Sequence, residues 1–218
     1  MKLYMKATVK KYILNFKQAS GTSRGVMTEK ETWFLILENE GKKGIGECCV
    51  FRGLSYDDRL DYSDKLSEVC QWIEAGKKAD ELWEMLRDWP SIQFGVEQAF
   101  LSLESHNPFV LFPSRFTNSQ AAIPINGLVW MGNKEFMKAQ IDDKLANGFN
   151  CIKLKIGAIN FDEELDLIRY IRSNYSKEIV EIRVDANGGF SSIEALDKLT
   201  QLAELDLHSI EQPIKKNQ

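Results

Sequence analysis

Histidines and metal-type cysteine spacings are scarce in this chain. Its 218 residues include two histidines, His106 and His208, which stand far apart, and four cysteines without a CxxC spacing. We therefore expect neither Ser-His-Asp nor Cys-His catalysis, no zinc site and no disulfide framework. Free thiols in a reducing cytoplasm are the simplest interpretation of Cys48, Cys49, Cys70 and Cys151.

Long apolar runs and an excess of positive charge are also lacking. No stretch is apolar for long enough to cross a bilayer, and the lysine-rich start, MKLYMKATVKKYIL, lacks the apolar core of a secretory signal. The net charge of −4 leaves no basic stripe for a phosphate backbone. With 44% apolar and 28% charged residues, the chain is typical of a globular cytoplasmic protein without a membrane or nucleic-acid partner.

The first half of the chain predicts an α+β domain. Residues 3–16 alternate as in a strand, and residues 32–47 add an apolar run, a glycine-bearing turn and a second short strand. Between them, QASGTSRGV at 18–26 indicates a loop whose two glycines allow movement. A solvated loop is the simpler interpretation, and a mobile lid over a site is the functional one.

Helical spacing replaces the strand pattern after this sheet. Two apolar stripes lie between residues 57 and 89, formed by Leu60, Leu66, Val69, Trp72 and Ile73 and then by Leu82, Trp83 and Leu86. A further helix is predicted over 91–105, with Ser91 as its N-cap. The segment 107–120 has two prolines and no regular period, so we expect a linker there. The predicted domains are therefore 1–118 and 119–218.

The second half alternates strands with helices, which predicts βα units on a parallel sheet with right-handed crossovers. Strands are expected at 121–129, 151–157, 179–188 and 207–214, and helices at 134–146, 161–173 and 191–205.

Three of these strands have one apolar and one ionic face, because side chains alternate along a strand. The apolar positions are Ile152, Leu154, Ile156, Ile182, Val184, Ala186 and Ile210. The other face holds Cys151, Lys153, Lys155, Glu181, Arg183, Asp185, Asn187, Ser209 and Glu211. An open sheet would leave these charges in water, whereas a closed (β/α) barrel would turn them inward, where they must pair or hold a metal.

The inward interpretation predicts a reactive site at the carboxyl ends of the strands. Asp185 and Glu211, from neighbouring strands, are the kind of ligands that Mg²⁺ takes while leaving positions for substrate oxygens. A lysine beside a cation and a second ammonium loses its proton more readily, so Lys153 and Lys155 would suit proton transfer. Each motif alone is common, and their order and spacing are more specific than any one of them.

These residues resemble the enolase superfamily, and the resemblance extends over nearly the whole chain. The motifs are SRGV (23–26), GIGECCVFRGLS (44–55), KLK (153–155), DAN (185–187) and IEQP (210–213). The resemblance implies an α+β capping domain with a lid loop, followed by a TIM-type barrel of which this chain holds the first four βα units. It also implies that a lysine base and Mg²⁺ act through an enediolate.

Within the superfamily, the chain is most similar to members of the muconate-lactonizing subgroup that remove water from a succinyl-hydroxycyclohexadiene carboxylate in menaquinone biosynthesis. The resemblance makes Lys155 the base, with Lys153 as its electrostatic support, and makes Asp185 and Glu211 the Mg²⁺ ligands. Asn187 and Arg183, on the same face of the sheet, would surround and support these groups without binding the metal or the substrate themselves. Arg24, in the lid loop, would meet the succinyl carboxylate.

Several alternatives stay open. Dipeptide epimerases and muconate cycloisomerases share the same lysine and carboxylate motifs. The family barrel has eight strands, and this chain ends at Gln218 after the fourth. We therefore expect a fragment lacking a third acidic ligand and an opposing lysine, inactive alone. A non-catalytic half-barrel that needs a partner, or a homo-oligomer, is the other interpretation.

Overall fold

A computed structural model describes residues 5–22 and 25–217, which form two compact units. One unit is Met1–Gln18 with Thr28–Ala122, and the other is Ala19–Met27 with Ile123–Gln218. The domain limits inferred from the sequence, 1–118 and 119–218, stay a prediction. Among the described residues, no helix is long and apolar enough to cross a membrane.

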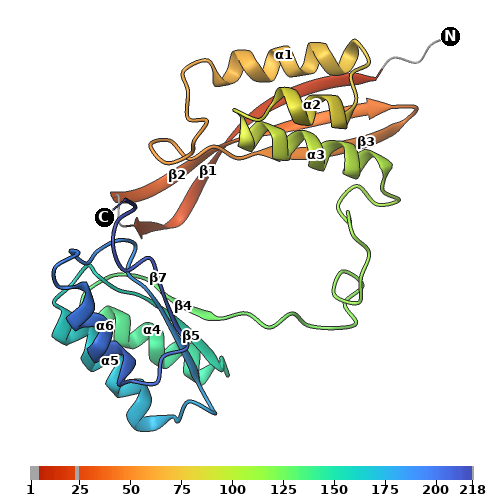
Figure 1. Ribbon diagram of the computed structural model, residues 1–218. Helices are drawn as coiled ribbons and strands as arrows, with labels where there is room; N and C mark the ends of the chain where they lie inside the picture. Colours follow the sequence, from red (N-terminus) through yellow and green to blue (C-terminus); the bar gives the residue numbers. More distant parts are fainter. Residues whose placement is uncertain (1–4, 23–24, 218) are drawn as a thin grey trace. The chain divides into compact units, whose positions relative to one another are not determined.

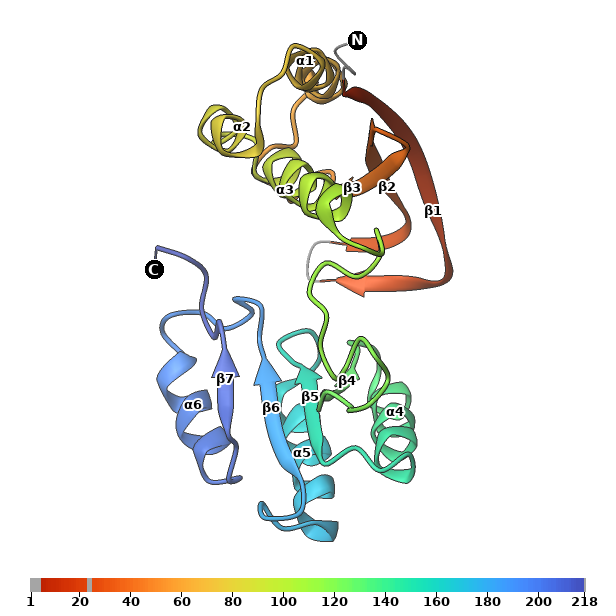
Figure 2. The ribbon, with the colours of Figure 1, turned by 90° about the vertical axis from the view of Figure 1, so that its right-hand side faces the viewer.

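The first unit is a three-stranded sheet covered on one face by three helices (Figure 2). Its elements are β1 (Lys6–Thr22), β2 (Gly25–Asn39), β3 (Lys42–Cys48), α1 (Tyr62–Glu74), α2 (Ala79–Met85) and α3 (Pro90–Glu104), except that the end of β1 and the start of β2, within Ala19–Met27, are grouped with the other unit. The strands lie in sequence order, and β2 and β3 are antiparallel. The prediction of a loop at 18–26 is wrong for the residues that the structure describes there. Strand β1 continues to Thr22, and β2 begins at Gly25.

The core of the first unit forms where β3 approaches α3 very closely. Leu35 and Leu37 of β2 are fully buried on this face, and Gly44 and Gly46 of β3 lie against the backbone of α3. A Cβ atom on Gly46 would lie 1.8 Å from the carbonyl oxygen of Gly95. The absence of side chains at these glycines therefore sets the distance between strand and helix.

Most residues of the two predicted apolar stripes are buried, whereas Trp72 is partly buried and Leu60 and Trp83 are exposed. Leu66, Val69 and Ile73 are at most 1% exposed. Leu60 is fully exposed because α1 begins only at Tyr62, so Leu60 lies outside the helix that would have turned it inward. Trp83 is 43% exposed, although it is in α2.

The N-terminus of α3 is capped by a residue distant in sequence. Ser91 was expected as N-cap, but the helix begins at Pro90 and Ser91 is its second residue. The buried Asp57 carboxylate accepts hydrogen bonds from the Ser91 amide at 2.8 Å and from its hydroxyl at 2.6 Å. A carboxylate here compensates the partial positive charge of the helix terminus.

As expected from their lack of a regular period, residues 107–120 contain no helix or strand, and their role as a linker stays a prediction. The second unit follows as a four-stranded parallel sheet in the order β4-β5-β6-β7, with its helices on one side (Figure 1). Its elements are β4 (Gly127–Val129), α4 (Lys134–Ala146), β5 (Cys151–Lys155), α5 (Phe161–Asn174), β6 (Glu181–Asp185), α6 (Ala195–Ala203) and β7 (Ser209–Glu211). The alternation of strands and helices is confirmed, although the strands are shorter than predicted.

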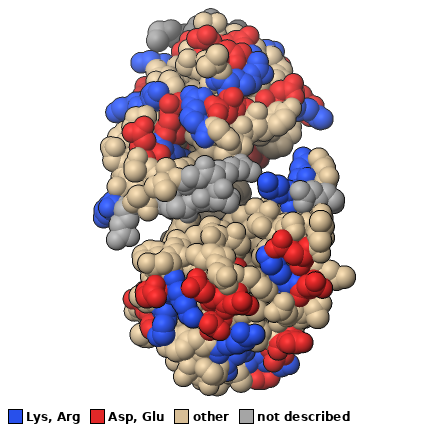
Figure 3. All heavy atoms as spheres, turned by 90° about the vertical axis from the view of Figure 1, so that its left-hand side faces the viewer, with Lys and Arg blue, Asp and Glu red and all other residues tan. Residues whose placement is uncertain are grey.

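The face of this sheet that meets the helices is the predicted apolar one. Ile152, Leu154, Ile182 and Val184 are at most 1% exposed and belong to one core with Ile168 of α5. Burying the apolar side chains here leaves the charged ones on the opposite face of the same strands. Acidic and basic side chains are interspersed over the molecular surface that faces the viewer in Figure 3.

The contact of β3 with α3 generates a stability prediction. Replacing Gly46 by alanine forces the strand and the helix apart, and we expect a loss of about 1–3 kcal/mol in the free energy of unfolding of the first unit. Urea unfolding followed by tryptophan fluorescence measures this, since four of the five tryptophans lie within 28–122. Lys42→Ala, at an exposed position of β3, is the control and should change little. A Gly46→Ala protein as stable as the parent would contradict the close approach.

Candidate active site

The ionic residues of the second unit meet at one edge of the sheet, where its parallel strands end. Lys155, Asp185 and Glu211 are the last residues of β5, β6 and β7. In the strand register, Lys155 lies opposite Asp185, and Asp185 lies opposite Glu211. Two residues back in β5, Lys153 shares their face. The structure therefore brings together the four residues that the sequence placed at the centre of the site.

These four side chains form a chain of alternating charge. The Lys155 ammonium donates to Asp185 Oδ2 at 2.6 Å, and the Lys153 ammonium donates to Glu211 Oε2 at 2.5 Å. Lys153 Nζ also lies 4.0 Å from Asp185 Oδ2. The Lys155 ammonium thus contacts a carboxylate on the neighbouring strand β6, whereas the Lys153 ammonium reaches across β6 to a carboxylate on β7.

Burial differs sharply within this group. The Asp185 side chain is 2% exposed, those of Lys155 and Lys153 are 21% and 25% exposed, and that of Glu211 is 59% exposed. A carboxylate as buried as Asp185 must be paired, because an isolated charge there would be very costly. Lys155 and Lys153 provide the opposite charge, so the four groups belong together electrostatically.

The turn after β6 contributes a further contact. Asn187 has a φ of +47° and the following Gly188 has a φ of +72°, so the chain turns sharply directly after the strand. In this conformation the Asn187 amide nitrogen donates to Asp185 Oδ1 at 2.9 Å, and Asn187 Oδ1 accepts from Lys155 Nζ at 3.2 Å. Asn187 therefore contacts both members of the Lys155–Asp185 pair.

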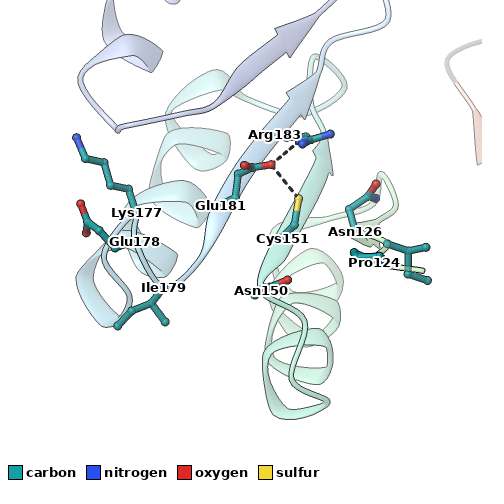
Figure 4. A pocket seen from close by; sticks show the side chains of 10 residues that line it. Pro124, Asn126, Asn150, Cys151, Lys177, Glu178, Ile179, Glu181 and Arg183 are labelled. Carbon is teal, nitrogen blue, oxygen red and sulfur yellow. Dashed lines mark hydrogen bonds and ion pairs between the residues drawn. The ribbon is translucent and has the colours of Figure 1, made fainter. Parts of the chain in front are cut away.

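Arg183 is on the same face but has different partners. Its Nε donates to Glu181 Oε1 at 2.6 Å, and Cys151 Sγ donates to the same oxygen at 3.4 Å (Figure 4). These residues line a pocket of 540 Å³ where β5 and β6 begin, at the opposite end of the strands from Lys155. The supporting role inferred for Arg183 stays a prediction. Arg24 lies outside the described residues.

The donor groups present suit part of a site for a hard divalent cation. Asp185 and Glu211 supply carboxylate oxygens from adjacent strands, and Mg²⁺ commonly uses one or two protein carboxylates with water and substrate oxygens. Within residues 5–22 and 25–217, no group of three or more His, Cys, Asp or Glu residues is arranged to hold a metal. Asp185 and Glu211 are the candidate carboxylates for such an ion.

One buried carboxyl group near this edge was not predicted. Glu164, in the first turn of α5, is 1% exposed, and its Oε1 accepts from backbone amides of the segment directly after β5. Its sequence signal was weak, because it is one of three acidic residues at the start of a helix, where such residues are common.

Known proteins resemble this chain in sequence and in fold. Residues 137–218 match the family described as Enolase C-terminal domain-like. The chain is 39% identical to the o-succinylbenzoate synthase of Desulfotalea psychrophila, covering 98% of this chain and 66% of that protein. It resembles the crystal structure of MenC from the same organism with a TM-score of 0.81 and 34% identity, over 99% of this chain and 66% of that one.

A more distant likeness shows the fold alone. The o-succinylbenzoate synthase of Thermosynechococcus elongatus, solved with Mg in its active site, matches with a TM-score of 0.73 and 20% identity, over 96% of this chain and 62% of that one. The chain thus spans slightly less than two thirds of these relatives. Its lysine and carboxylate positions, its fold and its similarity along nearly its whole length lead to one conclusion: the chain belongs to the enolase superfamily.

Proposed function

We propose that this chain supplies the base and two metal ligands of an o-succinylbenzoate synthase, a lyase of menaquinone biosynthesis. The reaction removes water from a succinyl-hydroxycyclohexadiene carboxylate. The observation that carries the proposal is the placement of Lys155 Nζ, 2.6 Å from the buried Asp185 at the carboxyl end of β5. The 39% identity to an enzyme of that name supports the choice among superfamily activities.

The proposed chemistry begins at Lys155. As a neutral amine, Lys155 takes the proton from the carbon alpha to the substrate carboxylate, and the carbon–hydrogen electron pair passes into an enediolate. The bond between the neighbouring ring carbon and its hydroxyl then breaks. Because the elimination is syn, the Lys155 ammonium returns its proton to the departing hydroxide, giving water and the aromatic product. Lys153, on the same face, stabilises the negative charge of the intermediate.

Asp185 and Glu211 are the proposed ligands of Mg²⁺. When bound, the ion supplies positive charge next to the substrate carboxylate, where the enediolate develops. The burial of Asp185 limits competition from water at this ligand, and the exposure of Glu211 leaves its carboxylate accessible to an ion from solvent. Asn187 holds Lys155 toward Asp185 through its Oδ1 atom.

The same proposal extends to the architecture. The four-stranded sheet of the second unit is the first part of a (β/α) barrel, with its helices outside and its ionic face inside. This accounts for a parallel sheet with helices on one face only, because parallel sheets are otherwise covered on both. Arg24, in the segment between β1 and β2, is proposed to meet the succinyl carboxylate.

The metal ligands generate a binding prediction. Asp185→Asn and Glu211→Gln each remove a carboxylate charge, and we expect each to weaken Mg²⁺ binding by about tenfold or more. Isothermal titration calorimetry with MgCl₂ on this chain measures the affinity without any requirement for activity. Glu135→Gln, at an exposed position of α4, is the matched control. Unchanged affinity in both site variants would remove the metal assignment.

The base generates an activity prediction for the complete protein. Lys155→Ala should lower turnover of the succinyl-hydroxycyclohexadiene carboxylate by at least about 10³-fold, because no other group replaces the lost proton acceptor. Circular dichroism should show an intact fold. Lys177→Ala, outside the lysine and carboxylate group, should leave turnover unchanged. Near-parent activity of the Lys155 variant would exclude it as the base.

The choice of substrate needs its own assay. Turnover of the cyclohexadiene substrate by the parent, without epimerisation of hydrophobic dipeptides, is the expected result. Dipeptide epimerisation without dehydration would replace the proposed activity with an epimerase. Absence of both, in a complete protein that binds Mg²⁺, would favour a non-catalytic barrel.

A further inference from the structure

A single carboxyl oxygen holds the loop that follows the candidate base. Glu164 Oε1 accepts hydrogen bonds from the amides of Gly157, Ala158 and Ile159, at 2.6, 3.2 and 3.4 Å. These three residues lie two to four positions after Lys155, the last residue of β5. The three amides need an acceptor, because their residues belong to no strand or helix.

This arrangement differs from ordinary capping of a helix. In a capping box, an acidic side chain in the first turn returns to the amide of the N-cap residue. In α5 the N-cap is Asn160, whose side chain accepts from the Asp162 amide at 2.8 Å. Glu164 instead reaches past Asn160 to the three preceding residues. It stabilises the loop rather than the helix end.

The position of Glu164 is costly for a carboxyl group. The residue is 1% exposed, and its second oxygen, Oε2, has no hydrogen-bond partner among the described residues. Leaving a buried polar atom unpartnered is unfavourable, so the three contacts of Oε1 must offset this cost. Burial also raises the pKa of the Glu164 carboxyl.

The loop held by Glu164 is in direct contact with the loop after β6. Gly157 has a φ of +88°, and a Cβ atom there would lie 3.0 Å from the Ala186 carbonyl oxygen. A Cβ atom on Gly189 would lie 2.9 Å from the Gly157 carbonyl oxygen. The two backbones therefore touch with no side chain between them, and a displacement of one must displace the other.

The second loop carries the contact to the base. Asn187 lies between Ala186 and Gly189, the two residues that meet Gly157, and its Oδ1 accepts from Lys155 Nζ at 3.2 Å. The Ile156 amide also donates to the Asp185 carbonyl oxygen at 2.9 Å. This bond joins the two loops where they leave β5 and β6. An unbroken series of contacts thus leads from Glu164 through both loops to the Lys155 ammonium.

We propose that Glu164 is a positioning residue: by holding residues 157–159 against the loop after β6, it keeps Asn187 in contact with the Lys155 ammonium. The catalytic meaning of this inference rests on the proposed function. The placement of the ammonium can be tested without any activity, so failure of one does not imply failure of the other.

The test is NMR of the chain labelled with ¹³C-lysine and ¹⁵N. In the parent, the two Hε protons of Lys155 should give separate signals, because the side chain is held in one place. Glu164→Ala should merge them and speed amide exchange of Gly157 by about tenfold or more. Glu164→Gln retains the acceptor oxygen and should preserve both properties. Glu163→Ala, the adjacent and exposed position of α5, is the matched control.

Two results would overturn the proposal. Faster Gly157 exchange with unchanged Lys155 signals in Glu164→Ala would show that the loop and the ammonium are uncoupled. Failure of Glu164→Gln to restore the signals would show that the acceptor oxygen is not responsible. If Glu164→Ala does not fold, Glu164→Asp takes its place, because its shorter side chain withdraws the oxygen from the three amides.

Steady-state kinetics of the complete protein adds the functional consequence. Glu164→Ala should lower kcat for the cyclohexadiene carboxylate about tenfold with KM within about twofold of the parent, because the base is misplaced while substrate contacts remain. A change confined to KM would contradict the positioning role. An inactive parent protein would instead count against the proposed function and leave the NMR result standing.

Discussion

The alternation of side chains across a parallel sheet is the constraint on which the second unit depends. Helices connect its strands and cover one face, so the buried apolar residues of β5 and β6 all lie on that face. The charged residues, which alternate with the apolar ones along each strand, must therefore lie on the opposite face of the sheet. Because the strands are parallel, their last residues meet at one edge, and groups far apart in the sequence become neighbours there. The fold and the candidate site are thus two results of one pattern.

The sequence predicted this pattern well because the pattern is local. The parity of Ile152, Leu154, Ile182 and Val184 and the limits of α4 follow from spacing within a few residues, and the structure agrees. The lysine and carboxylate group could be predicted for the same reason: each member ends or nearly ends a strand with a recognisable period.

Features that depend on distant contacts were missed. Asp57 caps α3 from 34 positions away in the sequence, and no local signal distinguishes it from Ser91 as the capping group. Leu60 fits a helical stripe but lies before the helix begins. In the sequence, Glu164 is one of several acidic residues in the first turn of a helix. Its burial and its three amide partners depend on the folded structure. The length of β6 was overestimated because Ile179, an apolar residue that fits the strand pattern, precedes the first ladder contact of this strand and is exposed.

The glycine contact between the loops after β5 and β6 has a consequence for the entropy of the site. Two backbones that touch at Gly157 and Gly189 cannot vary their conformations independently, so, under the proposed function, much of the ordering that Lys155 would require as the base is already present in the folded chain. A substrate that enters such a site does not need to supply that ordering from its own binding free energy. Under the proposed function, glycine, the residue that costs most conformational entropy during folding, would reduce the entropy still to be lost at the chemical step.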